Sequence, residues 1–101
     1  MPMTTEAMTQ TIAEYFKSQP VLKAWLFGSF ARGEETPESD VDILVEYDRS
    51  KRIGLLKISR MSLSLQSLLN REVDLVDSKT LFPWVAESVN KDKELIYERA
   101  N

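Results

Sequence analysis

The sequence of 101 residues contains no histidine and no cysteine. These two absences exclude zinc fingers, Ser-His-Asp triads, Cys-His nucleophiles and histidine-based acid–base catalysis. The lack of cysteine also permits a reducing compartment, because no disulfide is needed. Any enzyme built from this chain must therefore work with carboxylates, hydroxyls, cations and a metal ion bound through oxygen.

Long apolar segments and an excess of positive charge are missing as well. The longest apolar run has four residues, as in 24–27, which is too short to span a membrane. Residues 1–6 lack the cationic and apolar regions of a signal peptide. Thirteen Lys and Arg against sixteen Asp and Glu give a net charge of −3, which argues against general nucleic-acid binding. We therefore expect a cytoplasmic protein with no membrane attachment and no direct DNA binding.

What is present suffices for one compact core. Apolar residues make up 43% of the chain and include four Phe, three Tyr and two Trp. The length is that of one ordinary domain, and the sequence shows no repeat, linker or low-complexity tract. We therefore expect a single domain over residues 1–101.

The chain alternates between helical and extended patterns. Helices are predicted from Thr4 or Thr5 to about Ser18 and over 54–70, with a helical turn at 30–32. Strands are predicted over 21–27, 40–47 and 72–77, and one or two short helices over 81–100, interrupted near Pro83 and Asn90. This order predicts an α/β or α+β domain built on a small sheet.

The helix over 54–70 carries leucines on two faces. Its core face is predicted to consist of six residues, Leu55, Ile58, Met61, Leu65, Leu68 and Leu69. Leu56 and Leu63 lie together nearly opposite, among polar residues. Isolated exposed leucines are normal, so chance or contact with the C-terminal tail is one explanation. Our hypothesis is that they contact a helical partner or a second copy of the chain.

Three carboxylates are the candidate catalytic residues. Asp40 and Asp42 stand two apart in a predicted strand, so their side chains leave the same face with Cα atoms about 6.5–7 Å apart. Asp74 lies in another short strand and joins them if the two strands pair. Gly28 and Ser29 follow a strand and precede a helical turn, where backbone N–H groups and a hydroxyl can hold phosphate oxygens.

Each motif alone also has an ordinary explanation, as a solvated Asp-x-Asp or a Gly-Ser turn. Their joint order, with acids opening an apolar strand, favours a functional site because burying an unpaired Asp costs several kcal/mol. Three close carboxylates raise one another's pKa unless a cation intervenes. Mg²⁺ prefers oxygen ligands and substrate phosphates, and two such ions can support an in-line phosphoryl displacement.

These residues resemble the signature of the minimal nucleotidyltransferases, in the DNA polymerase β-like nucleotidyltransferase superfamily. The resemblance rests on Gly-Ser-Phe-Ala-Arg-Gly at 28–33, Ser-Asp-Val-Asp-Ile-Leu-Val at 39–45 and Arg-Glu-Val-Asp-Leu-Val at 71–76. It implies a small mixed sheet flanked by helices and a site for two Mg²⁺ ions on Asp40, Asp42 and Asp74.

The resemblance also implies roles for individual residues. Gly28 and Ser29 would contact the β and γ phosphates of ATP. Asp40 and Asp42 would ligate metal, and Asp74 would complete the second metal site and favour deprotonation of the acceptor hydroxyl. Arg32 either offsets triphosphate charge or pairs on the surface with Glu34 or Glu35.

The resemblance further implies a reaction and a partner. The reaction would be transfer of AMP from ATP to a tyrosine of a HEPN-family RNase toxin, with this chain as the antitoxin in a hetero-oligomer. The chain is too short for an acceptor-recognition domain of its own. Two alternatives remain: an antitoxin that neutralises its partner by binding alone, and a homodimeric small-molecule nucleotidyltransferase.

Overall fold

The computed structural model describes residues 4–36, 38–81 and 83–100. Within these ranges, four helices and four strands follow one another. They are α1 (Thr5–Phe16), β1 (Val21–Phe27), α2 (Ser29–Arg32), β2 (Val41–Tyr47), α3 (Leu55–Leu69), β3 (Val73–Asp77), α4 (Pro83–Asp92) and β4 (Glu94–Glu98). The bounds of α1, β1, α2, β2, α3 and β3 agree with the predicted elements to within two residues.

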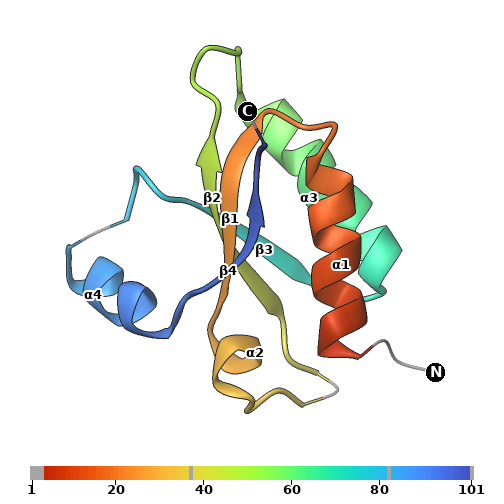
Figure 1. Cartoon of the computed structure of the whole chain (residues 1–101), viewed down its shortest axis with the longest axis vertical. Helices are drawn as coiled ribbons and strands as arrows, with labels where there is room; N and C mark the ends of the chain where they lie inside the picture. The colour runs from red at the N-terminus through yellow and green to blue at the C-terminus, as the bar shows by residue number, and fades with distance from the viewer. Residues whose placement is uncertain (1–3, 37, 82, 101) are drawn as a thin grey trace.

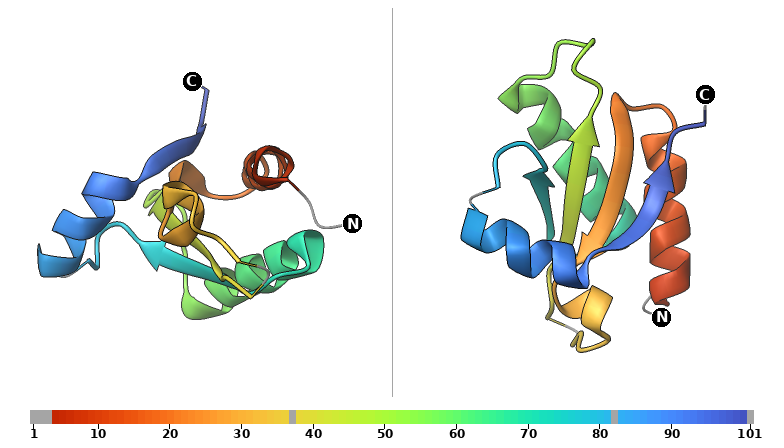
Figure 2. Two further views of the ribbon diagram at one scale, coloured as in Figure 1. Left: turned by 90° about the horizontal axis from the view of Figure 1, so that it is seen from below. Right: turned by 60° about the vertical axis from the view of Figure 1, so that its left-hand side comes forward.

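The strands form one mixed sheet in the order β3-β2-β1-β4. β1 pairs antiparallel with both β2 and β4, whereas β2 and β3 are parallel. α1 and α3 cover one face of this sheet, α4 lies on the other face, and α2 lies at the end of the sheet where β2 and β3 begin (Figures 1 and 2). This arrangement confirms the expected small mixed sheet flanked by helices.

Local sequence explains where the main helices begin and end. The Thr4 hydroxyl accepts the backbone N–H of Ala7 at 3.1 Å and caps α1. Asn70 closes α3 in the left-handed conformation, with φ 55° and ψ 41°. Pro83 does not interrupt a helix as predicted; it begins α4, where its missing N–H costs nothing.

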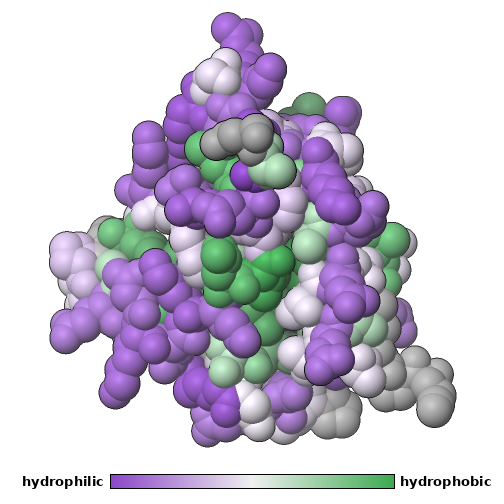
Figure 3. Space-filling model, viewed as in Figure 1, coloured by the Kyte–Doolittle hydropathy of each residue, from purple (hydrophilic) through white to green (hydrophobic). Residues whose placement is uncertain are grey.

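The main core lies between the sheet and the pair α1 and α3. Helix residues at a spacing of four meet alternate strand residues there, which buries Met8, Ile12, Phe16, Val41, Ile43, Val45, Met61, Leu65 and Leu69 among others. Leu44 and Val89 are buried outside this cluster. Figure 3 shows hydrophobic side chains reaching the surface over the strands between α4 and α1. On β4, Leu95 is 49% exposed.

The tail prediction is wrong in its second half, because residues 94–98 form strand β4 rather than a helix. The pairing with β1 shifts register between Ala24 and Trp25. Ile96 and Tyr97, although consecutive, both pack against the core. A bulge of this kind breaks the two-residue alternation that identifies a strand in a sequence.

The predicted core face of α3 is too wide. Leu55 is 84% exposed and Leu68 is 50% exposed, so neither belongs to the core. A helix packed against one neighbouring helix and one sheet face buries only a narrow stripe. Within the described ranges, no helix is both long and apolar enough to cross a membrane.

Candidate active site

Gly28 makes the sharp turn between β1 and the single-turn helix α2. Its backbone has φ 75° and ψ −150°, a region that residues with side chains rarely adopt. A Cβ at this position would overlap Oδ2 of Asp42 and lie 3.3 Å from its Cγ. Position 28 therefore requires glycine for its conformation and also because the Asp42 carboxylate packs directly against the backbone.

The sheet register brings the predicted acidic residues together. Asp42 on β2 is the Cα partner of Phe27 on β1 and of Asp74 on β3. Neighbouring strands lie about 4.8 Å apart, so the two aspartates are adjacent at the end of the sheet beside Gly28. Asp40 immediately precedes β2, and both Asp40 and Asp74 are exposed whereas Asp42 is partly buried.

The electrostatics of Asp42 respond to burial and to both neighbouring carboxylates. The pKa of Asp42 is raised, first by burial, then by the charge of Asp74 and then by that of Asp40. Arg32 acts in the opposite direction on the same carboxyl group. The charge on Asp42 is therefore unfavourable in the protein alone, and a cation at this position would relieve it.

The donor set fits Mg²⁺ that arrives with a nucleotide. In the described part of the chain, no three His, Cys or acidic side chains are grouped closely enough to hold a metal ion by themselves. Mg²⁺, however, usually takes one or two protein carboxylates and completes its shell with water and substrate phosphates. The adjacent Asp42 and Asp74, with Asp40 nearby, supply that kind of partial site. The number of ions stays a prediction.

Arg32 lies beside this site and is already paired. Its Nε donates to Oε1 of Glu34 at 2.5 Å, and its Nη1 donates to Oδ2 of Asp92 at 3.1 Å. The pairing with Glu34 is one of the two predicted alternatives, whereas Glu35 instead accepts from the Thr5 hydroxyl at 3.3 Å. A contact between Arg32 and nucleotide phosphates stays a prediction.

Sequence reasoning missed the contribution of α4. A cavity of about 360 Å³ opens between the Gly28 turn and this helix, and it is lined by Phe27, Gly28, Arg32, Trp84, Ser88, Val89 and Asp92. Trp84 is 71% exposed at its edge. Nothing in the local pattern of the tail places these side chains beside Gly28, because only the packing of α4 on the sheet does so.

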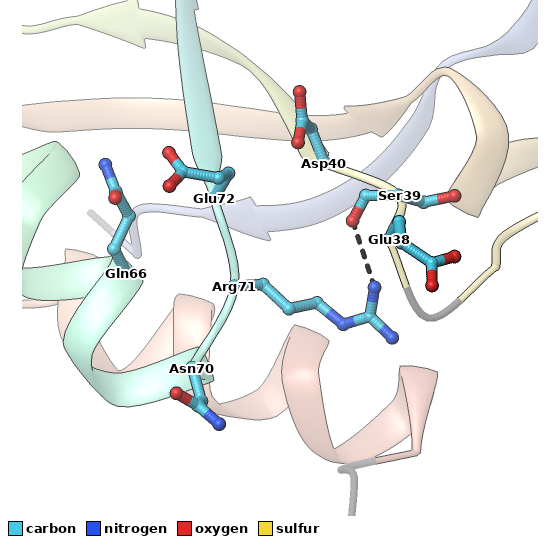
Figure 4. A pocket seen from close by; sticks show the side chains of 7 residues that line it. All are labelled: Glu38, Ser39, Asp40, Gln66, Asn70, Arg71 and Glu72. Atoms are coloured by element: carbon cyan, nitrogen blue, oxygen red, sulfur yellow. Dashed lines mark hydrogen bonds between the residues drawn. The ribbon is translucent and has the colours of Figure 1, made fainter.

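A second cavity of about 430 Å³ lies on the other side of Asp40 (Figure 4). It is lined by Glu38, Ser39, Asp40, Gln66, Asn70, Arg71 and Glu72. The side chain of Arg71 extends from the link between α3 and β3 toward the loop that carries Ser39. Of the predicted site residues, Gly28 and Arg32 line the cavity beside α4, and Asp40 lines the cavity beside α3.

The two leucines singled out on α3 are exposed, as the helical pattern predicts. Leu56 is 67% exposed and Leu63 is 64% exposed. The sheet order places β4 on the edge opposite β3, but Arg99, which follows β4, lines a cavity together with Lys57 in the first turn of α3. The contact of the two leucines with a partner stays a prediction.

Comparisons with known proteins agree with this geometry. The family model for "Polymerase beta, Nucleotidyltransferase" matches residues 10–101. A Methanocaldococcus jannaschii protein provisionally named protein adenylyltransferase MJ1379 is 41% identical over 73 residues, which are 71% of each chain. The protein adenylyltransferase MntA of Thermococcus cleftensis is 39% identical over 72 residues, covering 71% of this chain and 69% of that one.

Solved structures show the same fold. A structure provisionally assigned as a minimal nucleotidyltransferase has a TM-score of 0.77 and 30% identity, covering 91% of this chain and 95% of that one. A crystal structure of a toxin-antitoxin with AMP-PNP has a TM-score of 0.76 at 22% identity, covering 90% and 73%. One chain of the structure of a tri-AMPylated Shewanella oneidensis HEPN toxin in complex with an MNT antitoxin matches with a TM-score of 0.72 at 18% identity. The match covers 95% of this chain and 74% of that one.

Proposed function

Since the chain belongs to the polymerase beta nucleotidyltransferase family, we propose that it transfers AMP from ATP to a tyrosine hydroxyl of a HEPN-family toxin. The observation that carries the proposal is the register that places Asp42 beside Asp74, with the Asp42 carboxylate against the Gly28 turn. The two relatives described above, at 39% and 41% identity, are named as protein adenylyltransferases, which supports a protein as the acceptor.

Each site residue has a role in this reaction. Gly28 and Ser29 hold the β and γ phosphates through backbone N–H groups and the Ser29 hydroxyl. Asp40, Asp42 and Asp74 hold two Mg²⁺ ions. Bound Mg²⁺ neutralises phosphate charge and stabilises the attacking and leaving oxygens.

The bond changes follow from that arrangement. The acceptor oxygen attacks the α phosphorus, the bond from that phosphorus to the bridging oxygen breaks, and pyrophosphate leaves with the bond's electron pair. Asp74, which is exposed at the mouth of the site, favours loss of the proton from the attacking hydroxyl. Arg32 offsets negative charge on the triphosphate while keeping its contact with Asp92.

The acceptor is proposed to come from a second protein. Structural neighbours of this fold include a tri-AMPylated HEPN toxin in complex with an MNT antitoxin and a toxin-antitoxin with AMP-PNP. These complexes support an antitoxin that modifies its toxin within a hetero-oligomer, with ATP as the nucleotide.

The test is label transfer from α-labelled ATP to the purified product of the neighbouring gene in the presence of Mg²⁺. Wild-type protein should label that partner, and D40N/D42N should not. D77N is the matched control, because Asp77 is a carboxylate on the same strand as Asp74 that pairs with Arg49 instead of lining the site. Absence of label in a complex that forms normally would refute the enzymatic proposal.

One observation favours a second candidate, neutralisation by binding alone. Leu56 and Leu63 are exposed on α3 and line neither of the two cavities described above. If binding is sufficient, D40N/D42N will neutralise the partner fully and L56S/L63S will not. The double serine variant should lower the mass of the complex in light scattering while leaving the melting temperature of the free protein unchanged. An unchanged complex mass would reject the leucine contact.

A further inference from the structure

Arg71 connects three segments of the candidate active site that are separate in the sequence. It lies in the link between α3 and β3, three residues before Asp74. Asn70 ends α3 in the left-handed conformation, and the Arg71 side chain then reaches across to the loop that precedes β2 (Figure 4). The residue is therefore attached to the backbone of one acidic strand while its guanidinium contacts the segment leading to the other.

The contacts of Arg71 are specific. Its Nη1 donates to the carbonyl oxygens of Thr36 and Ser39, each at 3.0 Å. Its guanidinium carbon lies 5.0 Å from the centroid of the Phe30 ring. Phe30 is only 6% exposed and directly follows Ser29 in α2, so it provides a firm surface beneath the guanidinium.

The bond to Ser39 acts on the backbone next to Asp40. The Ser39 carbonyl belongs to the peptide group that joins Ser39 to Asp40, so the hydrogen bond orients that peptide plane. The N–H of Val41 then donates to the Glu72 carbonyl at 2.9 Å, which begins the pairing of this segment with the one that carries Arg71. The residues on both sides of Asp40 are therefore bonded to the α3–β3 link: Ser39 through the Arg71 side chain, and Val41 through the Glu72 backbone.

Other hydrogen bonds in the described part of the loop next to Asp40 join Thr36 to Ser39. The N–H of Thr36 donates to Oγ of Ser39 at 2.8 Å, and the N–H of Ser39 donates to the Thr36 carbonyl at 3.0 Å. These bonds shape the turn, but they are internal to it and do not attach it to the sheet. Asp40 itself is exposed and precedes the first residue of β2.

We propose that Arg71 is a positioning residue that holds Asp40 in register with Asp42 and Asp74 by tying the loop before β2 to Phe30 and to the α3–β3 link. The role needs a planar guanidinium, which can bond two carbonyls and stack on a ring together. A lysine ammonium is a point charge and can reproduce only part of this geometry. The inference rests on the proposed function, since it concerns the acidic site assigned there.

The experiment compares R71A and R71K with R99A as the matched control. Arg99 also joins two segments, donating to Asp48 at 2.8 Å and to the Gln19 carbonyl at 3.4 Å, but Asp48 follows the far end of β2. Five quantities are measured on each protein: Mn²⁺ affinity by electron paramagnetic resonance, hydrogen exchange of residues 34–41, melting temperature, and kcat and KM for ATP with the partner present.

For R71A we expect faster exchange over 34–41, a Mn²⁺ affinity weakened roughly 10-fold and a kcat lowered roughly 10- to 100-fold. KM for ATP should change less than kcat, because Gly28 and Ser29 are intact. R71K should lie between R71A and wild type. R99A should lower the melting temperature without changing Mn²⁺ affinity or kcat.

The proposal is overturned if R71A keeps wild-type Mn²⁺ affinity and exchange over 34–41, even if its melting temperature falls. It is also overturned if R99A reproduces every effect of R71A, since the role is then only structural. If R71A does not fold, the same measurements on R71K and F30L test the proposal. F30L removes the ring under the guanidinium while keeping an apolar side chain. If wild-type protein transfers no AMP, the proposed function fails, but the metal-affinity and exchange measurements still test Arg71.

Discussion

Substituting Gly28 by alanine tests whether the Gly28 turn and the Asp42 carboxylate form one unit. The substitution has two effects. It places a side chain at φ 75° and ψ −150°, and it inserts a Cβ where Oδ2 of Asp42 now lies, 3.3 Å from Cγ. The first effect strains the backbone, and the second moves a proposed metal ligand.

The magnitudes can be separated. A non-glycine residue in this backbone region costs about 1–3 kcal/mol. For a domain of this size each kcal/mol lowers the melting temperature by roughly 4–8 °C, so the backbone strain alone should lower the melting temperature of G28A by roughly 4–24 °C, and the collision with Asp42 adds to that loss. Displacing Asp42 by about 1 Å should lower the rate of AMP transfer by about 100-fold.

Gly33 and Gly54 provide matched controls. Gly33 also has a positive φ, 70°, but a Cβ there meets nothing within 4 Å. G33A should therefore cost about 1–2 kcal/mol of stability and leave AMP transfer within a few-fold of wild type. G54A, at φ −106° and also in open space, should leave AMP transfer unchanged and cost about 1 kcal/mol or less, because Gly54 is the N-cap of α3 and alanine caps less well.

The assays are thermal unfolding without metal and label transfer to the partner with Mg²⁺. In an Asp42→Ala background the collision is relieved, so G28A should cost no more than its backbone strain. The reasoning is refuted if G28A is as stable and as active as G33A. It is also refuted if the cost of G28A is the same with and without the Asp42 carboxylate.

Three further predictions concern charge and the α4 cavity. Burial and then two neighbouring carboxylates raise the pKa of Asp42, so its ionised form lowers the stability of the fold above the pKa of the unfolded chain. D42N should therefore raise the metal-free melting temperature at about pH 7, and this gain should vanish at about pH 3. Differential scanning fluorimetry measures both values. Hydrogen bonds from Ser50 and then Arg99 lower the pKa of Asp48 to about 2, so the ionised carboxylate stabilises the fold above its ordinary pKa and this stabilisation is lost on acidification. D48N should lower the melting temperature at about pH 7. In calorimetry, the difference in melting temperature between D48N and wild type should close as the pH falls to about 2. Trp84 is 71% exposed and lines the cavity beside β1, where we expect the adenine base to stack on its ring. W84A should keep the wild-type melting temperature and raise KM for ATP roughly 5- to 100-fold. An unchanged KM would show that the base binds elsewhere.

Local sequence was sufficient for most elements and for the face of β2 from which Asp42 leaves. The alternation from Val41 to Tyr47 buries every second side chain, and Asp42 must leave the opposite face. Glycine at 28 and 33 marks the two ends of α2, and both have positive φ. These features depend on neighbours within a few residues, so a sequence pattern can show them.

β4 could not be recognised in the same way. Its alternation is broken at the bulge opposite Ala24 and Trp25, so Ile96 and Tyr97 pack on the same side. The exposure of Leu55 and Leu68 was likewise unpredictable, because the width of the buried face of α3 depends on what packs against it. In both cases the deciding contact comes from a distant segment.

By itself, the sequence determined which groups are available for chemistry: three aspartates, a Gly-Ser turn, and no histidine or cysteine. Only the tertiary structure decided how they meet. The parallel register sets Asp74 beside Asp42, α4 closes a cavity next to Gly28, and Arg71 reaches back to the loop before Asp40. The physical reason is that strand pairing and side-chain hydrogen bonds act between residues about thirty positions apart, where no local periodicity records the contact.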